Sequence, residues 1–420
     1  MSTAVLAMTA YHSTVVTRKP DPATQDADAK AHHVKGWSGC TVKYQNTHSS
    51  FTPVNFKDIA MVVWHKTTGQ MPWPNPKLED HVVTVVPPKL LPSRTGSTNL
   101  RATWLGHACY YVEFPSGLRV LFDPVFEDHC APVALGSLKR YTEPPCDLSE
   151  LPFVDAVFIS HSHYDHLSHP SVQKIQKHFP NVHFFVGLGL QKWFQQGGIK
   201  NVTELDWWDE AEITLTPQQQ STKVDTDPKN SASSDAPSPG SITAKVACLP
   251  CQHGSGRGIL DQNSTLWCSW AVSSGGDETA GLGGGSKKSV WFGGDTGYRT
   301  VKQQPPDVDD WGEQFRDLPS CPQFKQIGER FGPFDLGLIP IGAYSPRHLF
   351  SSVHANPFDA VEIFRDTRCK NAMAIHWGTW VLTAEDVLEP PRLLKEALRR
   401  RGLPETGAFD TCDVGETREF

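Results

Sequence analysis

The segment that most constrains the fold is a run of six residues holding three histidines and one aspartate. This run, His161–His166, reads HSHYDH. It follows the apolar run Ala156–Ser160, which is typical of a buried strand, and precedes a helix expected over His169–Phe179. Three imidazoles and a carboxylate within six residues are more than chance would place among histidines that merely pack in a core. At the end of a strand they predict a metal site that a rigid sheet holds in place.

The spacing within this run provides ligands for two metal ions. In a tight turn, His161 and His163 can face one ion, which leaves Asp165 and His166 to face a second. Two ions each need three or four protein ligands, so other parts of the chain should supply more. Further candidates each follow an expected strand: His253 after Ile242–Leu249, Asp295 in a glycine-rich run after Val290–Phe292, and His376 after Ala372–Ile375. Imidazole nitrogen and carboxylate oxygen suit zinc, and less selectively Mn, Fe or Co.

Charge and cysteine content narrow the class of protein. The chain of 420 residues has 39 Lys and Arg against 46 Asp and Glu, a formal net charge of −7. This acidic balance argues against neutralising nucleic-acid phosphates, so we expect no nucleic-acid partner. Ten scattered cysteines are too few for a disulfide scaffold, and no run of about 18 apolar residues predicts a membrane-spanning helix. Strands that alternate with helices favour a mixed α/β protein.

Composition along the chain predicts three regions. Residues 1–36 are polar with little periodicity and predict a disordered leader. Residues 37–99 are rich in aromatics and prolines, which predicts an extended arm packed on the core. Residues 100–420 make the regular domain, with flexible insertions near 218–241 and 273–289. The first twenty residues weakly match a transit peptide; we expect a cytoplasmic protein on an intracellular membrane, with a mitochondrial address as the alternative.

The ligand pattern and several longer segments resemble a known family. His-x-His-x-Asp-His followed by a distant His, Asp and His resembles the metallo-β-lactamase superfamily, which implies an α/β (α+β) fold, a four-layer αββα sandwich. The longer segments resemble the N-acylphosphatidylethanolamine-hydrolysing phospholipases D. These segments are Thr103–Ala108, Ile159–Leu167, Glu204–Trp208, Phe292–Tyr298, Phe331–Asp335, Pro340–Arg347 and Ala374–Trp380. They are spread between Leu100 and Leu403, so the resemblance covers most of the chain.

Carried over position by position, the resemblance implies two zinc ions per chain. It assigns His161, His163 and His253 to a first ion, Asp165, His166 and His376 to a second, and Asp295 as a bridge between them. The implied reaction is hydrolysis of N-acylphosphatidylethanolamine to N-acylethanolamine and phosphatidic acid by a metal-bound hydroxide. A membrane phospholipid substrate, peripheral membrane contact, an apolar groove and a homodimer are implied as well. The residues after His253, Gly254–Arg257, depart from the family pattern.

Other side chains are candidates for supporting roles in this reaction. His354, Tyr298 and His107 are candidates for protonating the leaving alkoxide, and support of a ligand from behind or core packing is an equal alternative for each. With Asp295, His354 and Tyr298 complete the predicted catalytic set. Asp123, which follows an apolar strand, is expected to fix a ligand imidazole from behind.

Two further questions are a surface for membrane contact and the identity of the substrate. The apolar stretch within Phe51–Trp73 is a candidate docking surface, with ordinary packing as the other interpretation. The same ligands also serve hydrolases of lactones and of small phosphodiesters, so these substrates stay open. A catalytically dead scaffold is expected to lack ligands, whereas all seven positions are filled here.

Overall fold

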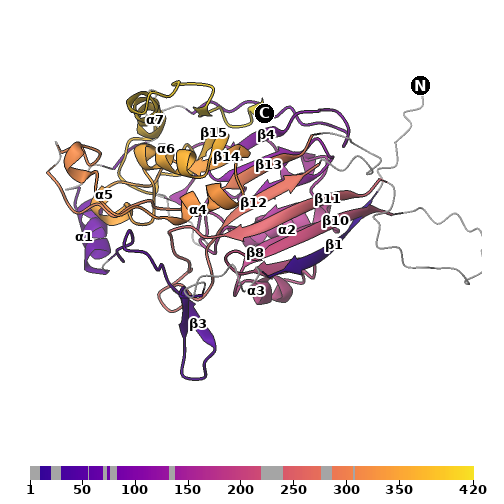
Figure 1. The fold of residues 1–420 in the computed structure, drawn as a ribbon, viewed down its shortest axis with the longest axis horizontal. Helices are drawn as coiled ribbons and strands as arrows, with labels where there is room; N and C mark the ends of the chain where they lie inside the picture. The colour runs from indigo at the N-terminus through magenta and orange to yellow at the C-terminus, as the bar shows by residue number, and fades with distance from the viewer. Residues whose placement is uncertain are drawn as a thin grey trace, which may run out of the picture.

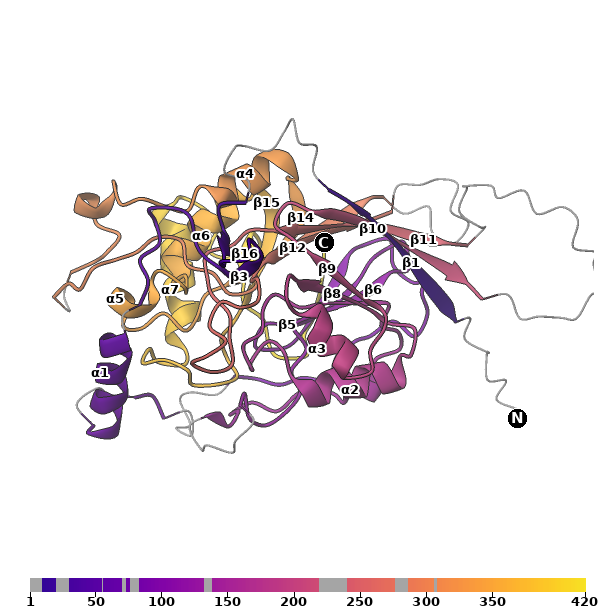
Figure 2. The same ribbon diagram turned by 90° about the horizontal axis from the view of Figure 1, so that it is seen from below.

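Two β-sheets lie face to face with helices on the outside of each (Figures 1 and 2). The structure is a computed structural model, and it describes residues 10–19, 30–54, 56–69, 73–75, 83–131, 138–218, 240–275, 286–305 and 308–420. The arrangement confirms the predicted four-layer αββα sandwich.

The larger sheet has eight strands among the described residues. In spatial order they are β1 (Tyr11–Arg18), β10 (Glu210–Pro217), β11 (Ile242–Leu249), β12 (Ser269–Ser274), β13 (Lys288–Phe292), β14 (Phe334–Pro340), β15 (Cys369–Ile375) and β16 (Phe409–Asp410). Pairing is antiparallel from β1 to β13 and parallel from β13 to β16.

The smaller sheet has seven strands in the part of the chain that is described. Their order is β17 (Thr417–Glu419), β4 (Arg101–Gly106), β5 (Cys109–Glu113), β6 (Arg119–Phe122), β7 (Ala156–Phe158), β8 (His183–Gly187) and β9 (Val202–Leu205). The strands β6 to β9 are parallel. In both sheets the carboxyl ends of the parallel strands share one edge, which is where α/β proteins place their functional groups.

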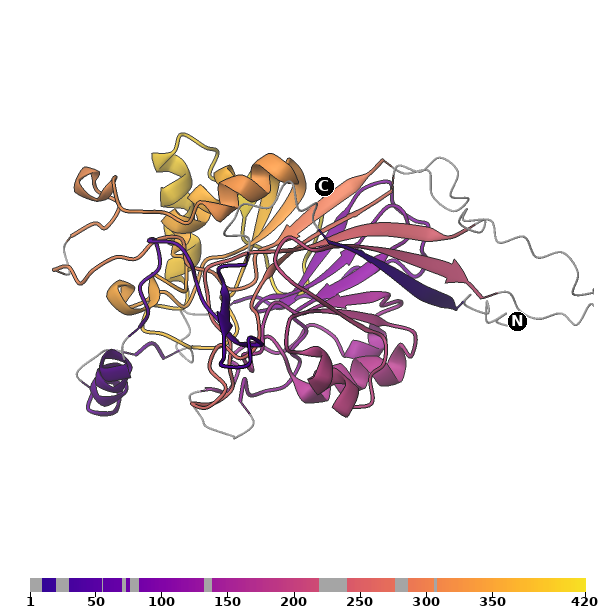
Figure 3. The same cartoon turned by 60° about the horizontal axis from the view of Figure 1, so that its bottom comes forward.

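Helices cover the outer faces of both sheets (Figure 3). The smaller sheet carries α2 (His169–His178) and α3 (Gln191–Gln196), and the larger sheet carries α4 (Gln323–Arg330), α6 (Pro357–Asp366) and α7 (Glu389–Arg400). The described residues also form α1 (Phe56–Thr67), α5 (Arg347–Phe350) and the 3₁₀ turns Leu148–Glu150 and Glu313–Phe315. Helix α2 begins at the N-cap Ser168 and buries Val172 and Ile175, so its apolar spacing determines which face meets the sheet.

The main core lies between the two sheets and is built from aromatic rings. Phe122 and Phe158 come from the smaller sheet, and Trp270 and Phe292 from the larger one; all four are fully buried. The ring centroids of Phe122 and Phe292 lie 4.8 Å apart, and those of Phe158 and Trp270 lie 5.6 Å apart. Such interdigitation across facing sheets fixes their separation and so the relative positions of their edges.

The prediction of a disordered leader is wrong for the described part of residues 1–36. Tyr11–Arg18 forms β1, which pairs along its whole length with β10. Tyr11 is buried and Val15 packs on the core, while the alternate residues face outward. The β-branched residues of this segment form an edge strand only because β10, about two hundred residues away, presents free backbone groups. Residues 1–9 and 20–29 lie outside the described residues.

The predicted boundary at residue 36 falls inside a hairpin, and the arm is not extended throughout. Strands β2 (His33–Lys35) and β3 (Thr41–Tyr44) pair across the boundary, and α1 follows. Among the described residues, no helix is both long and apolar enough to cross a bilayer. Most of the two predicted insertions, 219–239 and 276–285, lies outside the described residues.

One buried carboxylate, Asp206, ties the β2–β3 hairpin to the turn after β9. Its oxygens accept from His32 Nε2 at 2.7 Å, His33 Nε2 at 2.9 Å and Lys30 Nζ at 2.7 Å. The rings of His32 and Trp207 stack with centroids 4.3 Å apart. Burial alone raises the pKa of Asp206, but hydrogen bonds from His32 and Lys30 outweigh it and hold the pKa well below its usual range.

The hairpin is therefore expected to loosen in acid. A depressed pKa means that the stabilisation from Asp206 is complete above about pH 4, the unfolded value, and is lost as pH falls toward the folded value. Asp206→Asn should cost roughly 1–3 kcal/mol of hairpin stability at neutral pH and remove most of the acid dependence. Hydrogen exchange of the Thr41–Tyr44 amides as a function of pH measures both effects. An unchanged acid profile in Asp206→Asn contradicts the assignment.

Candidate metal centre

Seven predicted ligand side chains meet at one edge of the sandwich. The turn after β7 supplies His161–His166, the segment after β11 supplies His253, the turn after β13 supplies Asp295, and the end of β15 supplies His376. Most of these side chains are buried. The two facing sheets thus bring together residues more than two hundred positions apart in the chain.

A first group of donor atoms surrounds His163. Its Nδ1 lies 2.8 Å from Nε2 of His161 and 3.2 Å from Nε2 of His253. The Oδ2 atom of Asp295 lies 3.9 Å from Nε2 of His161 and 3.6 Å from Nε2 of His253. Three imidazoles and one carboxylate oxygen around one point form the donor set of a tetrahedral zinc site.

A second group shares the same Asp295 oxygen. Asp295 Oδ2 lies 3.2 Å from Nε2 of His166 and 3.1 Å from Nε2 of His376. The Oδ2 atom of Asp165 lies 3.4 Å and 3.5 Å from the same two nitrogens. The two groups therefore match the sets of ligands implied by the resemblance, with Asp295 between them.

The chemistry of the donor atoms fits divalent cations. Two of these atoms, Nε2 of His166 and Nε2 of His376, are buried and make no hydrogen bond, and the same holds for the other oxygen of Asp295, Oδ1. Buried polar atoms without partners are costly in a native protein, and a cation satisfies all of them at once. The fold and this donor set together indicate a divalent metal centre.

Electrostatics support the same conclusion. Burial raises the pKa of Asp295, but the imidazoles of His166 and His376 outweigh it and hold the pKa well below its usual range. Burial lowers the pKa of His376, but Asp295 and Asp165 outweigh it and raise the pKa to about 9. Without a cation, protons on imidazole thus balance the carboxylates. A divalent cation supplies the same positive charge, so its binding releases protons.

Hydrogen bonds from behind orient the imidazoles. The Nδ1 atom of His166 donates to Asp123 at 2.6 Å, and Nδ1 of His161 lies 2.8 Å from Ser160 Oγ, which donates to Asp123 at 2.5 Å. The Nδ1 atom of His253 donates to the carbonyl of Val353 at 2.8 Å. Because each of these bonds is made by Nδ1, the lone pair of Nε2 faces the centre. The contact expected between Asp123 and a candidate ligand imidazole is present, and a second one runs through Ser160 to His161.

Asp123→Asn is accordingly expected to weaken metal binding without removing a ligand. Oδ2 of Asp123 accepts from His166 Nδ1 and the Ser160 hydroxyl, and Oδ1 accepts from the Ser160 amide. An amide has only one such oxygen, so its NH₂ group must face at least one of these donors, and affinity should fall roughly 10- to 100-fold. A competition titration with a chelating dye measures the loss. The matched variant Asp335→Asn changes an acid paired with Lys370 away from the centre and should bind metal like the unchanged chain. Equal affinity of the two variants contradicts the role assigned to Asp123.

The candidates for the proton donor have different positions. His354 lies at the centre, with Nδ1 3.9 Å from Asp295 Oδ2 and its ring stacked on His376. Its side chain is 14% exposed, so it also reaches the solvent side. Tyr298 donates its hydroxyl to Asp366 at 3.0 Å and packs near Phe324, away from the ligands. The prediction of a catalytic role for Tyr298 is therefore wrong, because its hydroxyl bonds to Asp366 at the end of α6 and not to a candidate ligand.

His107 is a supporting residue of the second group. Its Nε2 lies 3.1 Å from Asp165 Oδ2, and its ring centroid lies 4.3 Å from that of His376. Burial and the neighbouring His376 lower the pKa of His107 to about 3. The ring is therefore neutral and donates Nε2–H to Asp165, which fixes that ligand.

Two side chains that sequence reasoning did not assign hold the centre through backbone carbonyls. Arg257 donates from Nε to the carbonyl of Ser162 at 2.7 Å and lies over the ring of Tyr164. Asn46, from the arm, donates to the carbonyl of His253 at 2.7 Å. The only sequence signal for Arg257 was its place in the segment that departs from the family pattern.

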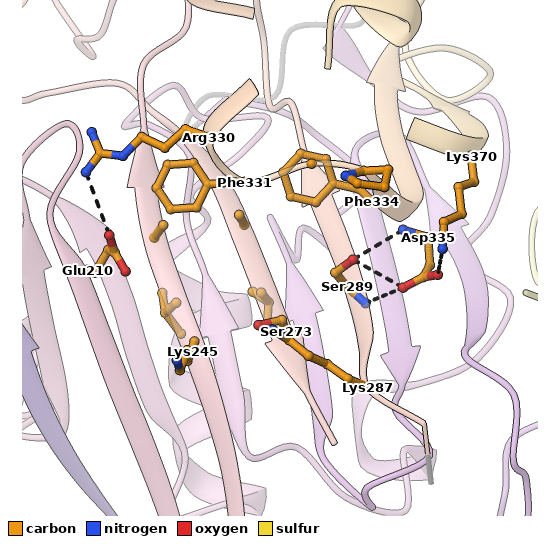
Figure 4. A pocket seen from close by; sticks show the side chains of 16 residues that line it. Glu210, Lys245, Ser273, Lys287, Ser289, Arg330, Phe331, Phe334, Asp335 and Lys370 are labelled. Atoms are coloured by element: carbon orange, nitrogen blue, oxygen red, sulfur yellow. Dashed lines mark hydrogen bonds and ion pairs between the residues drawn. The ribbon is translucent and has the colours of Figure 1, made fainter. Parts of the chain in front are cut away.

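A well-formed hollow lies away from the candidate ligands. A cavity of about 410 Å³ opens on the outer face of the larger sheet, beneath Phe331 and Phe334 (Figure 4). Its charged groups include the ion pair of Lys370 and Asp335, with N···O 2.9 Å. It contains none of the seven candidate ligands, so we assign it no part in the metal chemistry.

The sandwich and its histidine–aspartate centre define a metal-dependent hydrolase of the β-lactamase superfamily. The family model described as "Beta-lactamase superfamily domain" matches residues 118–377. A Caenorhabditis elegans protein named N-acyl-phosphatidylethanolamine-hydrolyzing phospholipase D 1 is 36% identical over 328 residues, 77% of this chain and 76% of its own length. The Saccharomyces cerevisiae protein named N-acyl-phosphatidylethanolamine-hydrolyzing phospholipase D, mitochondrial, is 32% identical over 76% of this chain and 55% of its own length. The chain belongs to the N-acylphosphatidylethanolamine-hydrolysing phospholipase D family and is a metal-dependent phosphodiesterase.

Proposed function

We propose that the chain hydrolyses N-acylphosphatidylethanolamine to N-acylethanolamine and phosphatidic acid. The observation that carries the proposal is the meeting of seven ligand side chains in two groups around Asp295 Oδ2. The names of the two relatives supply the substrate class. Water adds its oxygen to phosphorus, the bond from phosphorus to the ethanolamide oxygen breaks, and the leaving alkoxide takes up a proton.

The proposed metal content is two zinc ions per chain. His161, His163 and His253 would hold the first, Asp165, His166 and His376 the second, and Asp295 both. A pair of such ions activates water at neutral pH and neutralises phosphoryl oxygens.

The protein's own groups position the reactants. Among the predicted proton donors, His354 is the one we retain, because it lies beside both groups and is partly exposed. Arg347 is committed to Asp310 and Asp359 at 2.7 Å each, so we give it a structural role rather than contact with the lipid headgroup.

Hydrolysis in isotopically labelled water tests the reaction. Purified chain loaded with zinc should place the label in phosphatidic acid and release unlabelled N-acylethanolamine, as read by mass spectrometry. Label in the ethanolamide means attack at carbon and contradicts the mechanism. Turnover of lactones or small phosphodiesters with none of the lipid contradicts the substrate, and fewer than two zinc ions per chain contradicts the stoichiometry.

The substrate belongs to a bilayer, so peripheral membrane contact is part of the proposal. Helix α1 of the arm exposes Met61 and Trp64 and is the first candidate surface. Removal of residues 37–75 should lower vesicle binding in a folded chain; unchanged binding contradicts this contact.

We also propose a homodimer, which sedimentation of the full chain tests. The proposed subcellular location is the cytoplasmic face of an intracellular membrane or a mitochondrion. The name of the yeast relative supports the mitochondrion.

A further inference from the structure

Two neighbouring loops beside the metal centre expose large apolar side chains at their tips. The β2–β3 hairpin carries Trp37, which is fully exposed, and Val42. The loop of residues 256–264 carries Ile259 and Leu260, which are 82% and 97% exposed. The described part of the chain exposes four other large apolar side chains, Val16, Met61, Trp64 and Val85, so the gathering of four on two neighbouring loops requires an explanation.

A backbone bond and the anchoring of each base hold the two loops together. The amide of Tyr44 donates to the carbonyl of Asn263 at 2.8 Å, which joins the hairpin to the loop. The hairpin base is fixed by the bonds from His32 and His33 to Asp206. The carboxylate of Asp261 accepts from backbone amides inside its own loop. The tips are therefore held at fixed positions by polar bonds, although their apolar ends pack on nothing described.

Both loops lead directly to the metal ligands. Arg257, two residues before Ile259, donates to the carbonyl of Ser162 in the ligand turn. Asn46, two residues after β3 ends, donates to the carbonyl of the ligand His253. Both loops are therefore bonded to the segments that carry the candidate ligands. Figure 1 shows the hairpin projecting from the body of the sandwich.

The charges around the tips indicate what they touch. Residues 30–50 contain three lysines and no acidic residue. Lys35 and Lys43 on the hairpin are exposed, whereas Asp261 is turned toward its own backbone. Convex tips with aromatic and aliphatic ends and flanking lysines suit an interface of acyl chains beneath anionic headgroups, rather than a flat protein surface.

We propose that the hairpin and the 256–264 loop form a docking device that inserts Trp37, Ile259 and Leu260 into an anionic phospholipid bilayer. This inference rests on the proposed function, because a lipid substrate is what makes the bilayer the occupant. It adds membrane contacts on loops outside α1, the first candidate surface named above. The substrate then leaves the bilayer beside the loops that carry the ligand contacts.

The test uses the full chain and a double variant, Trp37→Ser with Leu260→Ser. Co-sedimentation with vesicles of phosphatidylcholine and phosphatidic acid should show binding roughly 10- to 100-fold weaker than for the unchanged chain. Lys43→Gln should weaken it roughly fivefold and only for vesicles with phosphatidic acid. The control Val16→Ser removes another exposed apolar side chain, on β1, and should bind normally.

Turnover of the lipid in detergent micelles separates this inference from the proposed function. A folded double variant that keeps micellar turnover and loses vesicle binding supports the device. A folded double variant that binds vesicles normally overturns it. An unchanged chain that binds neither vesicles of phosphatidylcholine alone nor vesicles that also contain phosphatidic acid overturns it as well. Loss of vesicle binding in a chain that never hydrolyses the lipid, even in micelles, leaves the device supported and overturns the substrate assignment instead.

Discussion

Asp295→Asn is expected to lower kcat/KM by roughly 10³-fold or more. The Oδ2 atom of Asp295 lies within 3.9 Å of an imidazole nitrogen from each of four ligand histidines, so this carboxylate belongs to both groups. An amide has no negative charge with which to hold the two proposed cations together. The stabilisation that a metal pair gives to phosphoryl transfer is several kcal/mol, at about 1.36 kcal/mol for each tenfold in rate.

The experiment measures turnover and metal content in the same preparation. Asp295 is 2% exposed, so thermal melting must first show that the variant is folded. Asp335→Asn is the control, since Asp335 also carries an ion pair and hydrogen bonds but lies at the hollow on the outer face. It should keep turnover within about threefold of the unchanged chain. Substantial turnover by folded Asp295→Asn with a full metal complement contradicts the bridging role.

The fold was predictable where a segment's own composition determines its structure. The strand expected over Ile242–Leu249 has the bounds of β11, and the helix expected over His169–Phe179 is α2, which ends one residue earlier. Helix α6 begins at a capping box of Asn356 and Asp359, a signal that is local in the chain. Strand β1 was missed because its stability comes from pairing with a strand about two hundred residues away. Local polarity had indicated disorder there.

The meeting of the candidate ligands was predictable from sequence, whereas most of their supporting contacts were not. Histidines and aspartates that follow apolar strands converge because the carboxyl ends of parallel strands share an edge. The direction of a single hydroxyl has no such rule, and Tyr298 turned out to donate to Asp366. Asn46 and Arg257 act on backbone carbonyls, which leave no mark in the sequence of the ligand segments. Such contacts are visible only in three dimensions.

Gly294→Ala is expected to destabilise the fold by roughly 2–4 kcal/mol, because two costs add. Gly294 has φ +59°, which costs a residue with a Cβ about 1 kcal/mol. A Cβ there would also lie 2.6 Å from Ser160 Cβ. Ser160 cannot move freely, since its amide and hydroxyl both donate to Asp123. Overpacking of this kind costs about 1–3 kcal/mol.

Gly198→Ala separates the two costs. Gly198 also has a positive φ, +82°, but its Cβ would meet nothing within 4 Å. This control should lose only about 1 kcal/mol. Urea denaturation of both variants measures the difference, and metal affinity should fall in Gly294→Ala alone, because its neighbour Asp295 moves with it. If the two variants lose the same stability and both bind metal normally, the turn after β13 adapts to the added methyl, and close packing against Ser160 does not position Asp295.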